Sequence, residues 1–505
     1  MDARKKVFSN VAYLSFDWGF VALISLVFSF VLWKTLLPNQ YGIIATTINF
    51  TTIVSTFSLL GFSSALPKLI SEYLQKKNFK TVNELIRFSI KIILVAAILL
   101  SASILLTLDF VSNFTNLPKD ALLIGAVSVF VFTVYSLFAS ILSGFQNMRL
   151  IFVTDVVGYS VRIVLLLLLI FIGMQYMGAL IAVLVSFAII SILRFKTSWL
   201  RGEKNHIDKK TILFDYAFSG FVSSIALLVF FNSQTIILSV LKNLTEAGLF
   251  GTAFTMAVPI YSIPNILSGG LFPVTSQLSA NKKGGKQQSQ LVNLVLKYSL
   301  FIVVPLIVIL VFFSKPIILL FSRPEYLGAS QLLPIVALAS LANGIGSLFL
   351  SSLYAIKRPI LYRNIIIFSS LVFILLAITM TILWSSYGLS VAYLASTLLM
   401  AGITFIFLKK HLSMKFPFSD IGKIILASIA LYVTLFLIDF LSVSTTFKLI
   451  LASIGGLIYL ISLIPLRFYG ENEVQILKYA SDKMPRMKKY FNFIIRIISN
   501  KVPQD

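Results

Sequence analysis

The sequence predicts an all-α polytopic membrane protein with about fourteen transmembrane helices and no separate soluble domain. Its 505 residues are 58% hydrophobic and only 12% charged, with a mean hydropathy of +0.96. Soluble domains are about 25% charged, so this composition belongs to a membrane protein. The apolar residues form stretches of about twenty residues, which is the length that a helix needs to cross the hydrocarbon core. Residues 38–77 also recur later in the chain, as expected for a duplicated bundle of helices.

The recurrence relates residues 38–77 to residues 244–283, 206 positions further on. Gly42 falls on Gly248 at this offset. Each copy runs from a polar turn through a long apolar span, with a proline near its far end, to a basic loop. A period this long is not that of a solenoid repeat. We therefore expect two halves of similar structure, as in many transporters.

The apolar stretches predict fourteen spans and a basic tail. The spans lie near residues 10–33, 41–65, 84–107, 120–143, 152–172, 176–195, 213–240, 246–273, 291–313, 329–354, 362–383, 386–408, 421–440 and 446–467. In the tail, residues 469–505, the side chains of Met487, Phe491 and Ile494 fall on one helical face beside basic residues. This pattern favours an amphipathic helix on the inner leaflet, and a solvated basic tail is the alternative.

Basic residues gather in the loops on the N-terminal side of the membrane, including Lys76 and Lys77, the loop 196–211, and Lys409 and Lys410. The loops on the other side contain few: Lys34, Lys119, Lys242, Lys315, Arg323 and Lys448. This bias predicts a multi-pass protein of the cytoplasmic membrane with both termini in the cytoplasm. It also accounts for the net charge of +24 without a nucleic-acid partner.

Several classes of chemistry are excluded by what the sequence lacks. It contains no cysteine, and its two histidines, His206 and His411, both lie in basic loops, so neither thiol chemistry nor a histidine metal site is available. No phosphate-binding GxxxxGK[ST] motif of an ATPase is present. We expect no catalytic residues, no metal and no cofactor. The energy source is then an ion gradient, the membrane potential or the substrate gradient.

Several stretches resemble the polysaccharide flippases of the MOP superfamily, the Wzx-type oligosaccharide exporters. Each half has a short turn that contains a Tyr-Gly or Ala-Gly pair, and a span that ends at a basic loop follows this turn. The pairs are Tyr41-Gly42 and Ala247-Gly248. Three further segments are similar to the family. Two of them, SLFASILSGFQNMRL and SLFLSSLYAIKRPIL, align with each other at an offset of 209, which places Arg149 on Arg358. The third is SKPIILLFSRPEYLGASQLLPIVAL.

The resemblance implies the MATE-like MOP fold and alternating access around a central cavity. Residues 1–200 and 201–415 would be two pseudo-symmetric lobes of six helices, and residues 416–468 would add two C-terminal helices. Two spans beyond twelve favour the flippase branch, because the drug exporters of this superfamily usually stop at twelve.

The strongest candidate for substrate binding is Arg162, about ten residues and roughly 15 Å into the fifth span. Asp155, Gly158, Tyr159 and Arg162 share one helical face, which cannot face lipid cheaply. Arg162 could receive an anionic group, such as the phosphate of a lipid carrier, while Tyr159 contacts sugars. Alternatively, Arg162 could pair with Asp155 or Asp17 to hold helices together.

Two further cations occupy equivalent places in the two halves. Lys91 falls on Lys297 at the offset of 206, about 10 Å inside the membrane, and Arg87 lies one turn before Lys91. Together they could bind a diphosphate, or the long side chains could reach the inner headgroups instead. Asp17 in the first span is a candidate coupling carboxylate for Na⁺ or H⁺, or a partner of Arg162.

These residues predict a flippase that moves a lipid-linked oligosaccharide from the inner to the outer leaflet. Its partners would be that substrate, the membrane lipids and, as a further candidate class, glycan assembly enzymes. A cation-coupled multidrug exporter is the alternative, and it predicts an acidic cavity. A polytopic glycan-processing enzyme ranks last, because no outer loop is long or acidic enough to carry its chemistry.

Overall fold

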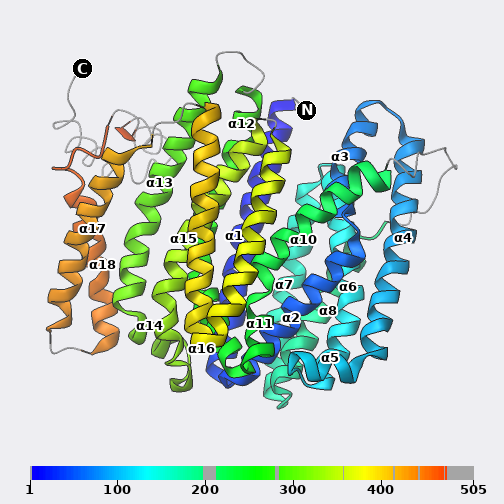
Figure 1. The fold of residues 1–505 in the computed structure, drawn as a ribbon, viewed down its shortest axis with the longest axis horizontal. Coiled ribbons are helices and arrows are strands. Elements are labelled where there is room, and N and C mark those ends of the chain that lie inside the picture. The colour runs from blue at the N-terminus through cyan, green and yellow to red at the C-terminus, as the bar shows by residue number, and fades with distance from the viewer. Residues whose placement is uncertain are drawn as a thin grey trace.

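The computed structural model describes residues 3–196, 212–278, 284–356, 358–412, 416–441, 444–470 and 473–474. All regular secondary structure in these ranges is helical, so the predicted all-α class is confirmed. The helices run side by side across the width of the molecule, and α1 begins at the end where α18 finishes, at the top of Figure 1. We call this the basic end, because the helix termini there carry residues such as Lys76, Arg149 and Lys410.

The first half of the chain forms a lobe from the first six predicted spans. Its helices are α1 (Ala3–Thr35), α2 (Pro38–Leu59), α3 (Phe62–Gln75), α4 (Phe79–Leu106), α5 (Leu108–Thr115), α6 (Lys119–Gly144), α7 (Met148–Phe171) and α8 (Gln175–Arg194). Leu60 and Gly61 have positive φ values of 48° and 80°, which separates α3 from α2. The side chains of Asn78 and Asn147 cap the first turns of α4 and α7.

The second half repeats this order. Its helices are η2 (Ile212–Ala217), α10 (Phe218–Asn232), α11 (Gln234–Leu241), α12 (Leu244–Leu278), α13 (Gly284–Phe312), α14 (Ser314–Phe321), η3 (Pro324–Tyr326), α15 (Ala329–Ala355) and α16 (Pro359–Leu412). The chain bends by 59° between α10 and α11. Trp384 and Ser385 are not helical, so α16 is two helices joined by a tight turn.

The two C-terminal helices, α17 (Phe418–Asp439) and α18 (Thr445–Ser462), form a pair beside α13 (Figure 1). Tyr459 on α18 donates a hydrogen bond to the carbonyl of Phe301 on α13, at 2.9 Å. Within the described ranges, eleven helices are long and apolar enough to cross a membrane, and the bent pair α10–α11 adds a twelfth. Dividing α16 at its turn and adding the shorter α18 gives the fourteen spans expected. The amphipathic tail predicted around Met487 lies outside the described residues.

The two lobes repeat each other's pattern of burial. Buried positions at the end of α1 coincide with those of α11 at an offset of 206, as Phe28 and Ser29 do with Gln234 and Thr235. From α15 to the turn in α16 the offset is 211: Leu137 and Phe138 match Leu348 and Phe349, and six of the seven buried positions of α7 match buried positions of α16. The offset of 209 that pairs Arg149 with Arg358 is therefore wrong by two residues. The second half has gained its extra residues before α15.

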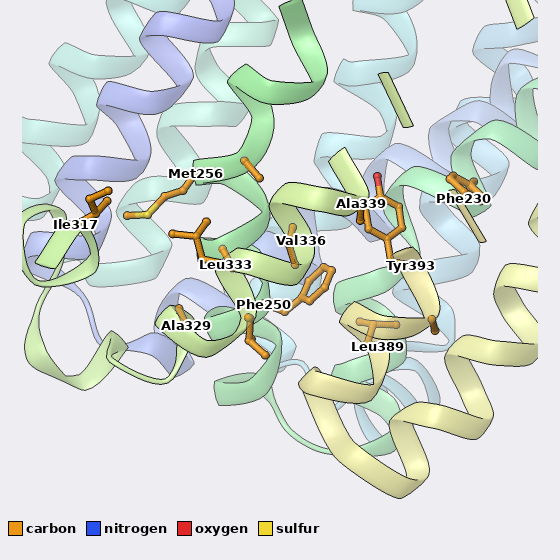
Figure 2. Close-up of a cluster of buried hydrophobic side chains, with 14 of the residues drawn as sticks. Phe230, Phe250, Met256, Ile317, Ala329, Leu333, Val336, Ala339, Leu389 and Tyr393 are labelled. Atoms are coloured by element: carbon orange, nitrogen blue, oxygen red, sulfur yellow. The ribbon is translucent and has the colours of Figure 1, made fainter. Parts of the chain in front are cut away.

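A large apolar core extends through both lobes, and Figure 2 shows part of it in the second lobe. The ring of Tyr393 on α16 lies 5.9 Å, between centroids, from the ring of Phe230 on α10 and 5.9 Å from that of Phe254 on α12. Lipid tails are as apolar as leucine, so close packing and hydrogen bonds hold these helices together rather than the hydrophobic effect. The Tyr393 hydroxyl accepts a hydrogen bond from the Asn343 amide at 2.8 Å, and this bond joins α15 to α16.

The lobes touch each other at both ends. At the end opposite the basic end, Gly42 on α2 meets Gly248 on α12, and a Cβ added to Gly42 would overlap the carbonyl oxygen of Leu244. The Tyr326 hydroxyl also donates to the Leu36 carbonyl there, at 3.2 Å.

Toward the basic end, a Cβ on Gly61 would overlap the Ala217 carbonyl, and the rings of Phe57 and Phe221 meet edge to face at 5.7 Å. The two glycine contacts bring backbones of the two lobes together more closely than any side chain would allow.

Candidate functional site

A cavity of about 620 Å³ lies between the two lobes. Helices α1, α2, α6, α7 and α8 line one side, and α10, α11 and α12 line the other. The charged residues of its wall, Asp17, Asp155 and Arg162, all come from the first lobe. The second lobe contributes aromatic, amide and hydroxyl side chains, which are Phe231, Asn232, Gln234, Thr235, Phe250, Phe254 and Thr255. Four of the residues predicted from sequence, Asp17, Asp155, Tyr159 and Arg162, therefore share one cavity.

Arg162 is held in a cage of aromatic rings. Its side chain is buried, with 8% of the residue exposed, and its guanidinium carbon lies 4.2 Å from the centre of the Tyr159 ring and 4.7 Å from that of Phe187. Its Nε donates a hydrogen bond to the Ser186 hydroxyl at 3.0 Å. Its Nη2 is buried and has no hydrogen-bond partner, a state that typically costs about 1–3 kcal/mol. Arg162 thus lines the cavity and has one donor that no protein atom uses.

Asp155 pairs with a second buried arginine, Arg194, at the end of α8. Arg194 Nη2 lies 2.6 Å from Asp155 Oδ2, and Arg194 is 0% exposed. Its Nε donates to the Thr154 hydroxyl at 2.9 Å, and its Nη2 also donates to the Ile151 carbonyl at 3.3 Å. The guanidinium lies over the Tyr135 ring, 4.8 Å from its centre. Asp155 is therefore engaged by α8 and not by Arg162.

Sequence reasoning missed Arg194, because it closes a span and is followed by Lys196 and a basic loop. A helical pattern could have found it. Ser186, Ile190 and Arg194 are spaced four residues apart, so they lie on one face of α8, and all three are buried.

Asp17 also belongs to this wall. It is 8% exposed, and its Oδ1 is buried without a hydrogen-bond partner. In the described part of the chain no ion pair joins Asp17 to Arg162. Beside it, Trp18 lines the cavity and remains half exposed.

The other predicted cations lie away from the cavity. Lys91 is exposed on α4, and Arg87 lies 3.5 Å from Glu84 one turn before it. Lys297 on α13 is bound by the segment that follows α18, since its Nζ lies 2.8 Å from Glu473 Oε1 and 4.4 Å from the centre of the Phe468 ring. The structure does not bring these three residues together with Arg162.

Glu473 gathers donors from two parts of the chain. Besides Lys297, the Tyr298 hydroxyl donates to Oε1 at 3.0 Å and the Gly470 amide to Oε2 at 2.7 Å. Burial alone would raise the pKa of this carboxyl, but these donors outweigh burial and lower its pKa below the ordinary value. This contact, the Lys297–Glu473 clasp, fastens the segment after α18 to α13.

Solved structures of similar fold are transporters. A lipid II flippase, MurJ, in an inward closed conformation has a TM-score of 0.70 at 20% identity, over 90% of this chain and 97% of that chain. An inward-facing multidrug resistance MATE family transporter of the MOP superfamily has a TM-score of 0.62 at 13% identity, over 77% and 94%.

A MOP superfamily transporter from Pyrococcus furiosus, described as having a binding pocket of reverse polarity, has a TM-score of 0.53 at 16% identity, over 80% and 95%. Identities this low show likeness of fold, and the fold is that of the MOP superfamily.

The family model for polysaccharide biosynthesis proteins matches residues 7–279, which is more than half of the chain. The protein therefore belongs to the polysaccharide biosynthesis protein family. A search of curated proteins found no match. Family and fold together define a multi-pass membrane transporter of the MOP type.

Proposed function

We propose that this protein is a flippase that moves a lipid-linked oligosaccharide across the cytoplasmic membrane by alternating access. The observation that carries the proposal is the Arg162 guanidinium, which is fixed in a cavity between two lobes and has a donor to spare. The polysaccharide biosynthesis family and the MurJ-like fold support the same class of substrate.

The cavity suits a substrate with one anionic group and several hydroxyls. Its volume of about 620 Å³ lies within the range of roughly 300–1,000 Å³ that is usual for ligand pockets. A phosphate oxygen would accept from Arg162, because guanidinium groups bind phosphate strongly. Tyr159 and Trp18 would contact sugar rings, and Asn232 and Gln234 would bond to sugar hydroxyls. The lipid tail would stay in the bilayer.

Alternating access would use the two glycine contacts in turn. Opening toward the basic end separates Gly61 from Ala217, and opening toward the other end separates Gly42 from Gly248. The excess of lysine and arginine at the basic end supports its assignment to the cytoplasm, with both termini on that side. Substrate would enter there and leave at the opposite end.

Asp17 is our candidate for ion coupling. Asp17 lines the same cavity as Arg162 and its Oδ1 has no hydrogen-bond partner, so an anion bound at Arg162 would disfavour negative charge on Asp17. Uptake of H⁺ or Na⁺ at Asp17 would relieve this repulsion and would link the substrate to an ion gradient.

A second candidate function is a cation-coupled multidrug exporter. The observation in its favour is the same Asp17 carboxylate, which could attract a cationic drug, together with the fold shared with MATE transporters. The two functions differ in the charge of the substrate and in the residue that holds it, which is Arg162 for the flippase and Asp17 for the exporter.

The test is transport in proteoliposomes with a fluorescent lipid-linked oligosaccharide. Wild type would be compared with Arg162→Ala and with Arg149→Ala, which removes an exposed arginine from the same helix. We expect Arg162→Ala to lose at least about 100-fold in rate, as loss of a buried charged contact of roughly 3 kcal/mol requires, and Arg149→Ala to transport normally. Folding would be checked by thermal unfolding in detergent. Equal rates for Arg162→Ala and wild type would contradict the proposal, and extrusion of a cationic dye without any flipping would favour the exporter.

A further inference from the structure

Helix α7 presents two opposite charges to the cavity, and they do not pair with each other. Asp155 and Arg162 are seven residues apart, a rise of about 10.5 Å along the helix. Side chains on a helix lean toward its N-terminus, so the long Arg162 side chain leans toward Asp155. Without other partners, the two groups would attract each other in this buried setting. In the structure each has a different partner.

Arg194 is the partner that engages Asp155. It reaches α7 from the end of α8 with three hydrogen bonds, to the Asp155 carboxylate, the Thr154 hydroxyl and the Ile151 carbonyl. The planar guanidinium can make these contacts at once because its donors point in fixed directions, whereas a lysine would make fewer. Arg162 is held separately, by the Ser186 hydroxyl and the Tyr159 ring.

We propose that Arg194 is a positioning residue for substrate binding: by holding Asp155, it keeps the Arg162 guanidinium available to the anionic group of the substrate. This inference rests on the function proposed above. Without Arg194, Asp155 would carry an uncompensated negative charge beside the cavity. Arg162 would then turn toward Asp155, and its free donor would be lost to the substrate.

The first measurement is binding of inorganic pyrophosphate to the full-length protein in detergent, by isothermal titration calorimetry. Arg194→Gln should weaken binding roughly tenfold, a coupling of the size usual for contacting charged groups. The double variant Asp155→Asn with Arg194→Gln should recover the affinity of wild type, because no carboxylate remains to capture Arg162. Arg149→Gln, the control on the same helix, should bind like wild type.

The second measurement needs no substrate. Phenylglyoxal modifies accessible guanidinium groups, and mass spectrometry of peptides reports the rate at Arg162 relative to that at Arg149. Arg194→Gln should slow modification of Arg162 several-fold, because the ion pair with Asp155 shields it, and the double variant should restore the rate. If Arg194→Gln does not fold, Arg194→Lys takes its place. Lysine holds Asp155 with fewer hydrogen bonds, so Asp155 should pair with Arg162 part of the time and slow its modification to a smaller extent.

The outcomes separate this inference from the proposed function. Unchanged labelling of Arg162 in Arg194→Gln or Arg194→Lys would overturn the inference, and so would a double variant that stays as slow as the single one. Pyrophosphate binding that is absent in wild type, or equal in Arg162→Gln and wild type, would count against the anion site itself. The labelling result would still decide the role of Arg194.

Discussion

The two lobes have the same order of helices and share most of their buried positions, but only one of them places charge beside the cavity. At the offset of 211, Asp155, Tyr159 and Arg162 of α7 correspond to Ile366, Ser370 and Phe373 of α16. Arg194 corresponds to Thr404 at an offset of 210, and Asp17 to Ser223 at 206. Every charged group of the candidate site thus has a neutral counterpart.

Phe373 and Arg162 show that matching positions of the two lobes have different roles. Phe373 is fully buried and packs its ring 5.3 Å from Phe230 and 6.1 Å from Tyr393. Arg162 occupies the matching place in the first lobe and is also surrounded by aromatic rings, but there the rings enclose a cation. A pseudo-symmetric fold therefore does not require symmetric chemistry. The first lobe holds the charged group, and the second supplies a neutral wall and an apolar core.

The sharpest way to break this comparison is to exchange the residues at matching positions. Phe373→Arg would bury a charge with no carboxylate in place, and we expect it to lower the free energy of unfolding by about 3–5 kcal/mol or to prevent folding. Arg162→Phe should stay within about 1 kcal/mol of wild type, because the rings around it can accept another ring, but it should not bind pyrophosphate. Thermal unfolding in detergent measures the stability of both variants, and calorimetry measures the binding of pyrophosphate. Equal stability of the two variants would show that the lobes do not differ as described.

The second prediction concerns the buried ion pair. Asp155→Asn leaves Arg194 buried without a negative partner and should cost about 3 kcal/mol. Asp109→Asn is the matched control, because the pair of Asp109 with Lys119 is exposed and such pairs contribute about 0–1 kcal/mol. Thermal unfolding of the two variants should therefore differ by several degrees. A similar small effect for both would mean that Asp155 is not required to balance Arg194.

The third prediction tests the symmetric contact between the lobes. Gly42→Ala and Gly248→Ala should each force the lobes apart at the end opposite the basic end, because the new methyl group meets backbone that cannot rotate away. The chain has no cysteine, so a single Thr255→Cys in the cavity wall reports opening through its rate of labelling by an impermeant maleimide. We expect a several-fold faster rate in both variants.

The control for this contact is Gly402→Ala, since nothing lies within 4 Å of a Cβ at Gly402. Its labelling rate should equal that of the background protein. A change in only one of the two glycine variants would contradict a symmetric contact.

The smallest effects should separate two lysines that the repeat makes equivalent. Lys297→Gln removes the charged donor of the Lys297–Glu473 clasp and should cost about 1–3 kcal/mol, whereas Lys91→Gln, at an exposed position, should change stability by less than about 0.5 kcal/mol. The clasp keeps the pKa of Glu473 low, so it contributes above the ordinary pKa of a glutamate and is lost as the pH falls through the lowered pKa. The difference in melting temperature between wild type and Lys297→Gln should shrink at acidic pH. A difference in melting temperature that does not change with pH would show that the Glu473 carboxylate does not contribute to the effect of Lys297.

Hydropathy was sufficient to predict where the long apolar helices lie, because a membrane span must be long, apolar and hydrogen-bonded within itself. It did not predict the short helices α3, α5 and α14 or the bend between α10 and α11. Helical spacing was sufficient to place Asp155, Tyr159 and Arg162 on one face. Partners from distant segments could not be predicted in this way. Arg194 resembles any basic residue at the end of a span, and nothing near Lys297 in the sequence indicates Glu473, which is 176 positions away. The position of a residue in a repeat does not determine which neighbours surround it.

The contact of Gly42 with Gly248 has a consequence for the origin of the fold. In a symmetric dimer, only a residue on the two-fold axis meets its own copy. Gly42 and Gly248 are copies of each other, and they meet here across the boundary of the lobes. If the halves were separate and identical chains, both sides of this contact would be the same residue, and any substitution would change both sides at once. In a single chain this constraint is absent, so each half can carry its own charges while the two glycines still meet.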